Sequence, residues 1–323
     1  LRIMPYPDFI GIVKSAWLHY DPSRPIESIS DISANVSTNH VYRIDLVGYQ
    51  PVIAKLSYFG HYEHFVEDHT IINSLANNLP APYENLLSRS LMKGNSLFIY
   101  RHQDGMIDAW VVFYRPIEIR KRLPRRLEKE HIEKLGEQFA HFHKACDSIH
   151  NTLPKSSKTL STDINHLLDI MDTEVGKFVH RLHQDTIRQQ CDLFFENCQQ
   201  LEVDSLSKIP VFLDWNIGNF SVTEDLQLFS RWDYDWFRLS NRMLDFYFLS
   251  RVVSDVGDRT VFSYNVSTLW EDRFLIFLKS YHTIYPLSAG EIRFLPEAYR
   301  FFILNYVIKD GRYFFHEIFA TKL

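Results

Sequence analysis

The chain has 323 residues, a formal net charge of −5 and 46% hydrophobic residues. This length is enough for one large domain or two ordinary lobes with a sizeable core, and the 23% of charged residues is typical of a folded, soluble chain. The acidic balance argues against a nucleic-acid-binding protein. No apolar run approaches the roughly 20 residues that cross a bilayer, so we expect no membrane partner.

The three cysteines, Cys146, Cys191 and Cys198, form no C-x-x-C pair, and their odd number argues against a disulfide framework. Residues 1–7 contain no apolar core of a signal peptide. We therefore expect a cytoplasmic protein, either a monomer or a homodimer.

The first 115 residues predict an antiparallel sheet and one helix. The helix is expected over residues 61–79, where the apolar residues have helical spacing, and Pro80 ends it. Four segments are predicted to be strands: 40–46, 51–56, 96–100 and 110–114.

After Pro116 the sequence is mainly helical. Helices are predicted over 128–146, twice between 160 and 201, and from 241 to the end with a break at 285–286, while a small β segment lies at 211–232. We therefore predict an α+β fold with a β-rich lobe at residues 1–115, a hinge near 113–118 and a helical lobe at residues 116–323.

Three polar residues of the small β segment point to phosphoryl transfer. Asp214 precedes Asn219 by five positions, and Asp233 follows fourteen positions later. In a Mg²⁺-dependent kinase one carboxylate accepts the proton of the attacking hydroxyl, while an amide oxygen and a second carboxylate hold the metal. We predict Asp214 as the catalytic base and Asn219 and Asp233 as the metal ligands.

From about residue 30 to residue 250 the chain resembles the aminoglycoside phosphotransferase and choline-kinase-like group of small-molecule kinases. Their catalytic loop usually reads His-Gly-Asp-x-x-x-x-Asn, and here Phe212 and Leu213 replace the His and Gly. Their metal segment usually reads Ile-Asp-Trp/Phe-Glu/Asp, and residues 232–235 read Trp-Asp-Tyr-Asp. Residues 242–246 resemble the Pro-x-x-Asp-Leu segment, whose Asp245 is expected to brace the catalytic loop by accepting backbone N–H bonds. The resemblance implies the two-lobed protein-kinase-like fold.

The resemblance also implies a nucleotide site. Lys55 matches the strand lysine that grips the α- and β-phosphates, although an edge lysine is the alternative interpretation. Its partner is expected on the following helix, where Glu67 shares a face with two apolar residues. Glu63 and Asp68 are the alternatives.

Two backbone segments complete the predicted nucleotide site. Ser37, Thr38 and Asn39 lie in the turn that would cover the phosphates, although it contains no glycine and a simple hairpin loop is the alternative. The backbone from Phe113 to Arg115 lies where such kinases read adenine. The resemblance therefore implies an enzyme that uses Mg²⁺ and ATP, or GTP, to phosphorylate a hydroxyl group of an aminoglycoside, amino-alcohol or sugar-like molecule.

Other functions stay open. The lost His and Gly favour a catalytically weak or inactive nucleotide-binding scaffold as the main alternative. A protein kinase is less favoured because the sequence has no Ala-Pro-Glu segment and no room for a long activation loop. Asp233 and Asp235 also match the D-x-D of some phosphatases and glycosyltransferases, but they come late in the chain. His61, His64 and Glu67 have metal-ligand spacing, but no third cluster completes a site.

Aromatic and acidic residues are candidates for the acceptor pocket. Trp236, Trp270, Glu271 and Asp272 could line it, and Trp215, Tyr234 and Trp236 could form a cation–π wall for a cationic substrate. Packing of these rings in the core is the alternative interpretation.

Overall fold

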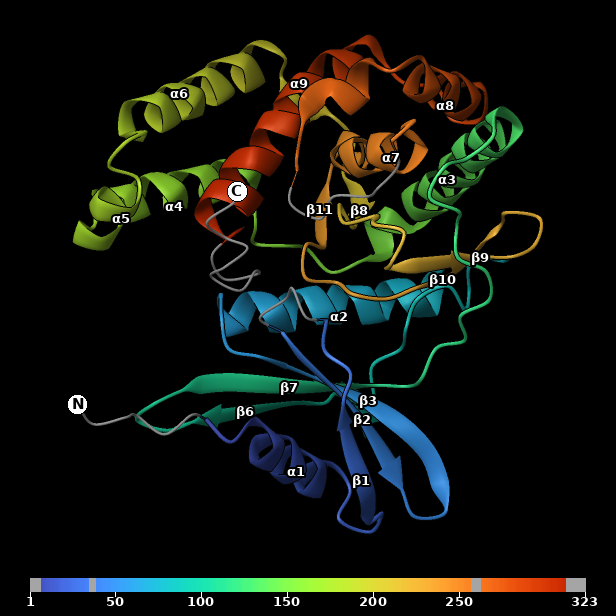
Figure 1. Ribbon diagram of the computed structural model, residues 1–323, viewed down its shortest axis with the longest axis vertical. Helices are drawn as coiled ribbons and strands as arrows, with labels where there is room; N and C mark the ends of the chain where they lie inside the picture. The colour runs from blue at the N-terminus through green and yellow to red at the C-terminus, as the bar shows by residue number, and fades with distance from the viewer. Residues whose placement is uncertain (1–6, 35–38, 257–262, 312–323) are drawn as a thin grey trace.

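The computed structural model describes residues 7–34, 39–256 and 263–311. A β-rich N-terminal part lies below a larger, mainly helical part, so the α+β architecture predicted from the sequence is confirmed (Figure 1). The N-terminal part contains α1 (Phe9–Tyr20), β1 (Ile26–Asp31), β2 (His40–Leu46), β3 (Tyr49–Ser57), α2 (Tyr62–Asn78), β4 (Met92–Lys93), β5 (Ser96–Leu97), β6 (Ile99–Gln103) and β7 (Asp108–Tyr114).

A five-stranded antiparallel sheet with the order β1-β2-β3-β7-β6 forms the N-terminal part. Lys55 lies in its central strand, paired with Val41 on one side and Val112 on the other. Alternate side chains of a strand point to opposite faces, so Ala54 and Leu56 enter the core under α1. Lys55 therefore points to the opposite face, toward Asp233 and Asp235 of the helical part.

The helix α1 was not predicted. Its buried residues Phe9, Ile12, Val13, Ala16 and Trp17 have the spacing of an amphipathic helix and cover one face of the sheet. Asp8 also accepts a hydrogen bond of 2.9 Å from the backbone N–H of Gly11 and so caps the helix. Both signals are present in the sequence.

The helix α2 lies between the sheet and the helices of the C-terminal part (Figure 1). Its residues Ile71, Ile72 and Leu75 are buried in the same apolar cluster as Phe139 of α3 and Phe212. The N-terminal part is therefore joined to the helical part through the core face of this helix.

In the C-terminal part, the described residues form helices and four short strands joined by loops. It contains α3 (Lys129–Ile149), η1 (His150–Thr152), α4 (Leu160–Asp172), α5 (Glu174–Val179), α6 (Gln184–Gln200), η2 (Val203–Ser205), β8 (Ile209–Val211), β9 (Phe220–Val222), β10 (Leu228–Arg231), β11 (Arg238–Ser240), η3 (Arg242–Asp245), α7 (Phe246–Val253), η4 (Val266–Trp270), α8 (Asp272–Ile284), α9 (Ala289–Phe302) and η5 (Ile303–Lys309).

Three helices, α4 to α6, occupy the region where the sequence predicts two. The predicted break is present at Thr173, whose side chain accepts from the N–H of Gly176 and begins α5. The second break, at 180–183, contains no glycine or proline, so periodicity did not show it.

Two antiparallel strand pairs position the loops that carry the predicted catalytic residues. β8 pairs with β11, and β9 pairs with β10. The loop at 212–219 runs from β8 to β9, and the loop at 232–237 runs from β10 to β11. The pairing therefore brings Asp214 and Asp233 to the same end of the small β region.

Candidate active site

The catalytic loop brings Asp214 and Asn219 into direct contact. The Nδ2 of Asn219 donates a 2.9 Å hydrogen bond to Oδ2 of Asp214, and its backbone N–H donates to the carbonyl of Asn216 at 2.8 Å. Because the amide donates through nitrogen, its oxygen is the atom with which it could ligate a metal.

Asp245 supports this loop from inside the core. Its Oδ1 accepts the backbone N–H groups of Phe212 at 3.0 Å and Leu213 at 2.7 Å, which confirms the predicted bracing contact. Its Oδ2 lies 2.9 Å from Nε2 of His143, and Nδ1 of that ring lies 2.8 Å from the hydroxyl of Tyr281. A carboxylate only accepts, so Nε2 donates here, and in the neutral ring Nδ1 accepts from the tyrosine.

Arg231 links the catalytic loop to the metal segment, a contact that sequence reasoning missed. Its fully buried guanidinium donates to the carbonyls of Asp214 at 2.9 Å, Asn219 at 3.0 Å and also Trp232. It lies 4.9 Å from the ring centre of Trp215, a cation–π contact. A charged residue within a short apolar strand was the available signal.

Lys55 reaches the metal segment from the other lobe. Its Nζ lies 3.3 Å from Oδ1 of Asp233 and contacts Oδ1 of Asp235. Lys55 is 6% exposed, whereas the side chain of Asp233 remains 38% exposed and reachable by a ligand. The sheet and the loop after β10 thus place one cation against two carboxylates.

The backbone at two of these positions is strained. Asp233 has a φ of 67° and Leu213, which precedes Asp214, has a φ of 57°. Non-glycine residues adopt this left-handed region at a cost of about 1 kcal/mol or more. The contacts of Arg231 and Asp245 to the neighbouring backbone hold these conformations in place.

The charges of the cluster shift its pKa values. Burial alone raises the pKa of Asp233, but the nearby charges of Lys55 and Arg231 outweigh burial and hold it below its ordinary value. Burial likewise favours a neutral Lys55, but Asp233 and Asp235 together raise the pKa of its ammonium above the ordinary value. Lys55 and Asp233 are therefore both charged at neutral pH.

No protein-family model matches the chain, and no curated protein matches its sequence. Solved structures do match its fold. The amicoumacin kinase hAmiN, solved with AMP-PNP, Ca²⁺ and Ami, has a TM-score of 0.65 at 15% identity and covers 94% of this chain and 85% of its own. A microcompartment-associated aminopropanol kinase has a TM-score of 0.62 at 14% identity, with 97% and 92% covered.

A third match is the GDP complex of wild-type aminoglycoside 2'-phosphotransferase-IIIa, with a TM-score of 0.56 at 12% identity and coverage of 98% and 96%. The chain has the small-molecule kinase fold. The two-lobed, protein-kinase-like architecture predicted from the resemblance is thereby confirmed.

Within this kinase fold, the predicted pair of Lys55 with Glu67 is wrong. Oε1 of Glu67 accepts from the Ser156 hydroxyl and the Ser157 N–H, both at 2.8 Å. The helix α2 is rotated so that this acid faces the segment between α3 and α4, and not the sheet.

The two alternative acids of α2 do not pair with Lys55 either. Asp68 lies 2.6 Å from Nζ of Lys158. Glu63 is 75% exposed and lies 3.8 Å from Arg101. Both contacts hold these carboxylates away from Lys55.

The backbone of the predicted hinge, from Phe113 to Arg115, is partly engaged in hydrogen bonds within the N-terminal part. The side chain of Phe113 is fully buried against Trp17, with ring centres 5.2 Å apart, on the α1 face of the sheet. Its carbonyl accepts from the N–H of Leu91 at 2.8 Å, and the N–H of Arg115 donates to the carbonyl of Arg89 at 2.9 Å. The segment 89–91 thus already uses the Phe113 carbonyl and the Arg115 N–H, and adenine recognition by this backbone stays a prediction.

Of the three residues predicted in the phosphate turn, Ser37 and Thr38 lie outside the described residues. Asn39 is described and is 6% exposed. Its amide donates to Oδ2 of Asp235, so it contacts the metal segment. A phosphate-binding role for these residues stays a prediction.

The predicted aromatic wall is not formed. Trp215 is fully buried and Trp236 is 6% exposed, with its ring centre 4.9 Å from that of Tyr306. Trp270 is 81% exposed, and Glu271 accepts from the hydroxyl of Ser254. Packing in the core is the correct account of Trp215 and Trp236.

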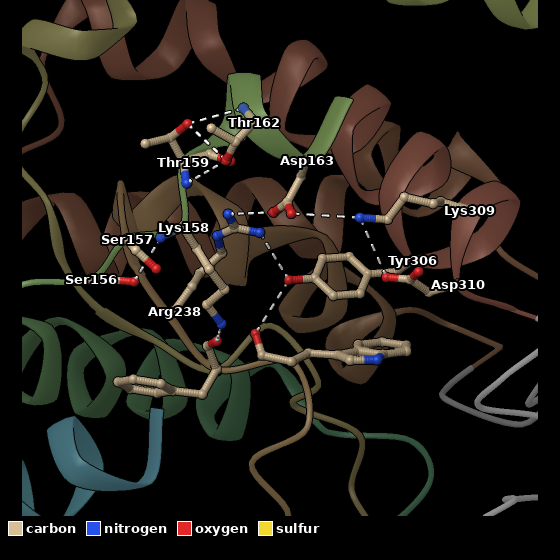
Figure 2. Close-up of polar contacts among 12 residues, drawn as sticks. Ser156, Ser157, Lys158, Thr159, Thr162, Asp163, Arg238, Tyr306, Lys309 and Asp310 are labelled. Carbon is tan, nitrogen blue, oxygen red and sulfur yellow. Dashed lines mark hydrogen bonds and ion pairs between the residues drawn. The ribbon is translucent and has the colours of Figure 1, made fainter. Parts of the chain in front are cut away.

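A cavity of about 860 Å³ adjoins the metal segment. Tyr234 and Asp235 line it together with residues of α2, α4 and η5. On one wall Arg238 pairs with Asp163 at 2.8 Å, and Lys309 lies 3.5 Å from Asp163 and 3.7 Å from Asp310 (Figure 2). These residues from three segments point toward one another and form a charged wall.

The carboxyl groups of this cavity are poorly solvated. Burial raises the pKa of Asp310 to about 6 and that of Asp68 to about 6, despite the nearby Lys309 and Lys158. Such carboxyls gain from a ligand that donates hydrogen bonds or carries a positive charge. Lys158, Arg238 and Lys309 line the same cavity and pair with its acids.

The oxygens of Asp233 and Asn219 suit a Mg²⁺ ion that is also coordinated by nucleotide phosphates. Among residues 7–34, 39–256 and 263–311 no group of three His, Cys, Asp or Glu side chains is arranged to hold a metal, which includes the His61 region. Mg²⁺ is commonly held by one or two protein oxygens plus phosphates, and the Asp233 carboxylate and Asn219 amide supply oxygens of that kind.

Proposed function

We propose that the chain is a phosphotransferase that uses Mg²⁺ and ATP, or GTP, to phosphorylate a hydroxyl group of a small molecule. The observation that supports this most strongly is the convergence of Lys55, from the central strand of the sheet, on Asp233, beside the hydrogen-bonded Asp214 and Asn219. In this proposal residues 1–115 supply the phosphate grip and part of the acceptor pocket, and residues 116–323 supply the catalytic loop and the rest of that pocket.

Each of the four site residues has a role in the proposed reaction. Asp214 accepts the proton of the acceptor hydroxyl as its oxygen attacks the γ-phosphorus, and the bond to the β–γ bridging oxygen breaks. Lys55 binds the phosphates, while Asp233 and Asn219 hold Mg²⁺, which when bound offsets negative charge on the phosphates. Catalysis rests on positioning and electrostatics more than on covalent chemistry.

The acceptor is proposed to occupy the cavity beside Asp235. Its carboxyl groups, Asp68 and Asp310 with pKa values raised to about 6, favour an amino-alcohol or another amine-bearing polyol. Two matched structures are named for an aminopropanol kinase and an aminoglycoside phosphotransferase, and this chemistry agrees with theirs.

A nucleotide-binding scaffold without catalysis is the second candidate, because Phe212 and Leu213 replace the family's His and Gly. Arg231 and Asp245 favour the enzyme, since together they hold the backbone on both sides of Asp214. A scaffold would have no need to keep that loop in a strained conformation.

Thermal melting with Mg²⁺ plus ATP or GTP tests nucleotide binding, and a turnover screen with amino-alcohols, aminoglycosides and sugars tests catalysis. We expect a Mg²⁺-dependent rise in Tm that Asp233→Asn removes. Asp214→Asn should keep the rise but lose turnover. An unchanged Tm at saturating nucleotide would refute both candidates, and a rise without turnover on any acceptor would favour the scaffold.

A further inference from the structure

The ammonium of Lys55 has two described carboxylate partners, and both lie in the metal segment. Asp233 is 3.3 Å away and Asp235 is in closer contact. If Asp233 turns to a metal ion, it can no longer hold the lysine at full strength. A second carboxylate can then keep the ammonium in place until it contacts the phosphates, because a buried ammonium without a partner is costly.

The helix α2 cannot provide that anchor. Glu67 and Asp68 are held by the segment 156–158, with contacts of 2.6–2.8 Å. His69 of α2 is buried, and burial, with smaller contributions from the charges of Lys55 and Lys158, lowers the pKa of its ring to about 3. This imidazole is therefore neutral and cannot serve as a charged partner of the lysine.

The carboxylate of Asp235 is fixed from two sides. Lys55 contacts Oδ1, and the amide of Asn39 donates to Oδ2. Its side chain is only 16% exposed. The carboxylate of Asp235, in the loop after β10, therefore contacts both Asn39, which precedes β2, and Lys55 in β3.

We propose that Asp235 is the positioning residue for Lys55, in the role that an acid of α2 would otherwise fill. The role rests on the proposed function, because the lysine needs this placement in order to grip nucleotide phosphates. Asp235 acts through Lys55 and not as a ligand of the metal, so its loss should weaken nucleotide binding with or without Mg²⁺.

Nucleotide affinity is measured by calorimetry for the wild type, Asp235→Asn and the control Glu67→Gln, each with Mg²⁺ and with EDTA. Loss of one charge-assisted hydrogen bond predicts a dissociation constant about tenfold or more weaker for Asp235→Asn under both conditions. Glu67→Gln should stay within about twofold of the wild type. Asp235→Asn combined with Lys55→Met should be no weaker than Lys55→Met alone.

Two results would overturn the role of Asp235. One is a loss of affinity in Glu67→Gln but not in Asp235→Asn. The other is an Asp235→Asn defect that appears only with Mg²⁺ and as a higher Mg²⁺ requirement, which would make the residue a metal ligand.

A nucleotide-free measurement separates this role from the proposed function. Acylation of Lys55 by an amine-reactive reagent, followed by mass spectrometry, should be several-fold faster in Asp235→Asn than in the wild type or Glu67→Gln. Asn39→Ala, which keeps every charge, should show a smaller increase in the acylation rate. This variant replaces Asp235→Asn in the test if Asp235→Asn does not fold. Equal acylation in all folded variants would refute the role, whereas faster acylation with no nucleotide binding by the wild type would refute only the kinase proposal.

Discussion

Arg231 donates a 2.9 Å hydrogen bond to the carbonyl oxygen of Asp214 from within the core, across a separation of 17 residues. The same guanidinium reaches the carbonyls of Asn219 and Trp232. The backbone of the proposed base Asp214, of the proposed metal ligand Asn219 and of the residue before Asp233 is thus organised around one buried cation. This arrangement gives the loop a rigid support although the usual His and Gly are replaced.

Replacing Arg231 with Met should destabilise the fold and disable the site. Three carbonyl oxygens would lose a charged donor, so we expect a loss of about 2–4 kcal/mol in the free energy of unfolding, measured in urea. In the proposed kinase, kcat should fall more than nucleotide affinity. Arg181→Met is the matched control, because Arg181 is exposed and packs 4.6 Å from the ring of Phe178. Equal stability of the two variants would contradict the role of Arg231.

Replacing Lys158 with Met should weaken the contact between α2 and the helical part. Lys158 lies 2.6 Å from Asp68 and donates to the carbonyl of Phe237 at 2.9 Å. The variant leaves a buried carboxyl without its cation, and we expect about 3 kcal/mol of destabilisation at pH 8.

The loss caused by Lys158→Met should shrink as the pH falls from 8 toward 6. The pKa of Asp68 is already raised to about 6 by burial, and removal of the lysine raises it further, so protonation relieves the unpaired charge. Lys155→Met, on the exposed part of the same segment, is the control. A pH-independent loss would show that packing, and not charge, dominates.

His69 should make the fold sensitive to acid. Its Nδ1 lies 2.9 Å from the carbonyl of Phe65 and therefore donates, which leaves Nε2 to accept from the hydroxyl of Tyr114. Burial, with a smaller contribution from Lys55, lowers the pKa of the ring to about 3, so the folded state keeps it neutral. The stability that this gives is present above the unfolded pKa of about 6.5 and is lost as the pH falls.

Urea unfolding of the wild type and His69→Gln between pH 7.5 and 4.5 measures this effect. Relative to the variant, the wild type should lose roughly 1 kcal/mol per pH unit below pH 6. Parallel pH curves would mean that the imidazole is protonated, or exposed, in the folded protein.

Gly136 should not tolerate a side chain. A Cβ at this position would lie 2.5 Å from the carbonyl oxygen of Phe277 and 3.2 Å from the backbone nitrogen of Tyr281, where α3 crosses α8. We expect Gly136→Ala to cost about 1–3 kcal/mol, although alanine favours helix. Gly105→Ala, with open space around its Cβ, is the control. A more stable Gly136→Ala would mean that the two helices separate easily.

The local pattern of apolar and polar residues was sufficient to predict many of the strands and helices. The alternation at 40–46 matches β2 (His40–Leu46), and the helical period at 61–79 matches α2 (Tyr62–Asn78). Both follow from the direction of successive side chains, which a sequence contains directly. The contact between Asp214 and Asn219 was also within reach, because five residues in a tight loop bring their side chains together.

Contacts between segments distant in the sequence could not be predicted from the local pattern. Glu67 and Asp68 are neighbours on α2, and successive helix positions differ by about 100° in direction. Whether such an acid meets Lys55 depends on how the helix is rotated against the sheet, and packing of Ile71, Ile72 and Leu75 into the core decides that rotation. The lysine meets Asp235 instead.

The sequence by itself thus determined the strand and helix periods, the two-part architecture and the spacing of Asp214, Asn219 and Asp233, because each depends on neighbours along the chain. The tertiary structure alone decided the partner of Lys55, the support by Arg231 and the occupied backbone at Phe113. Those contacts depend on how whole elements pack against one another, and no local period records that.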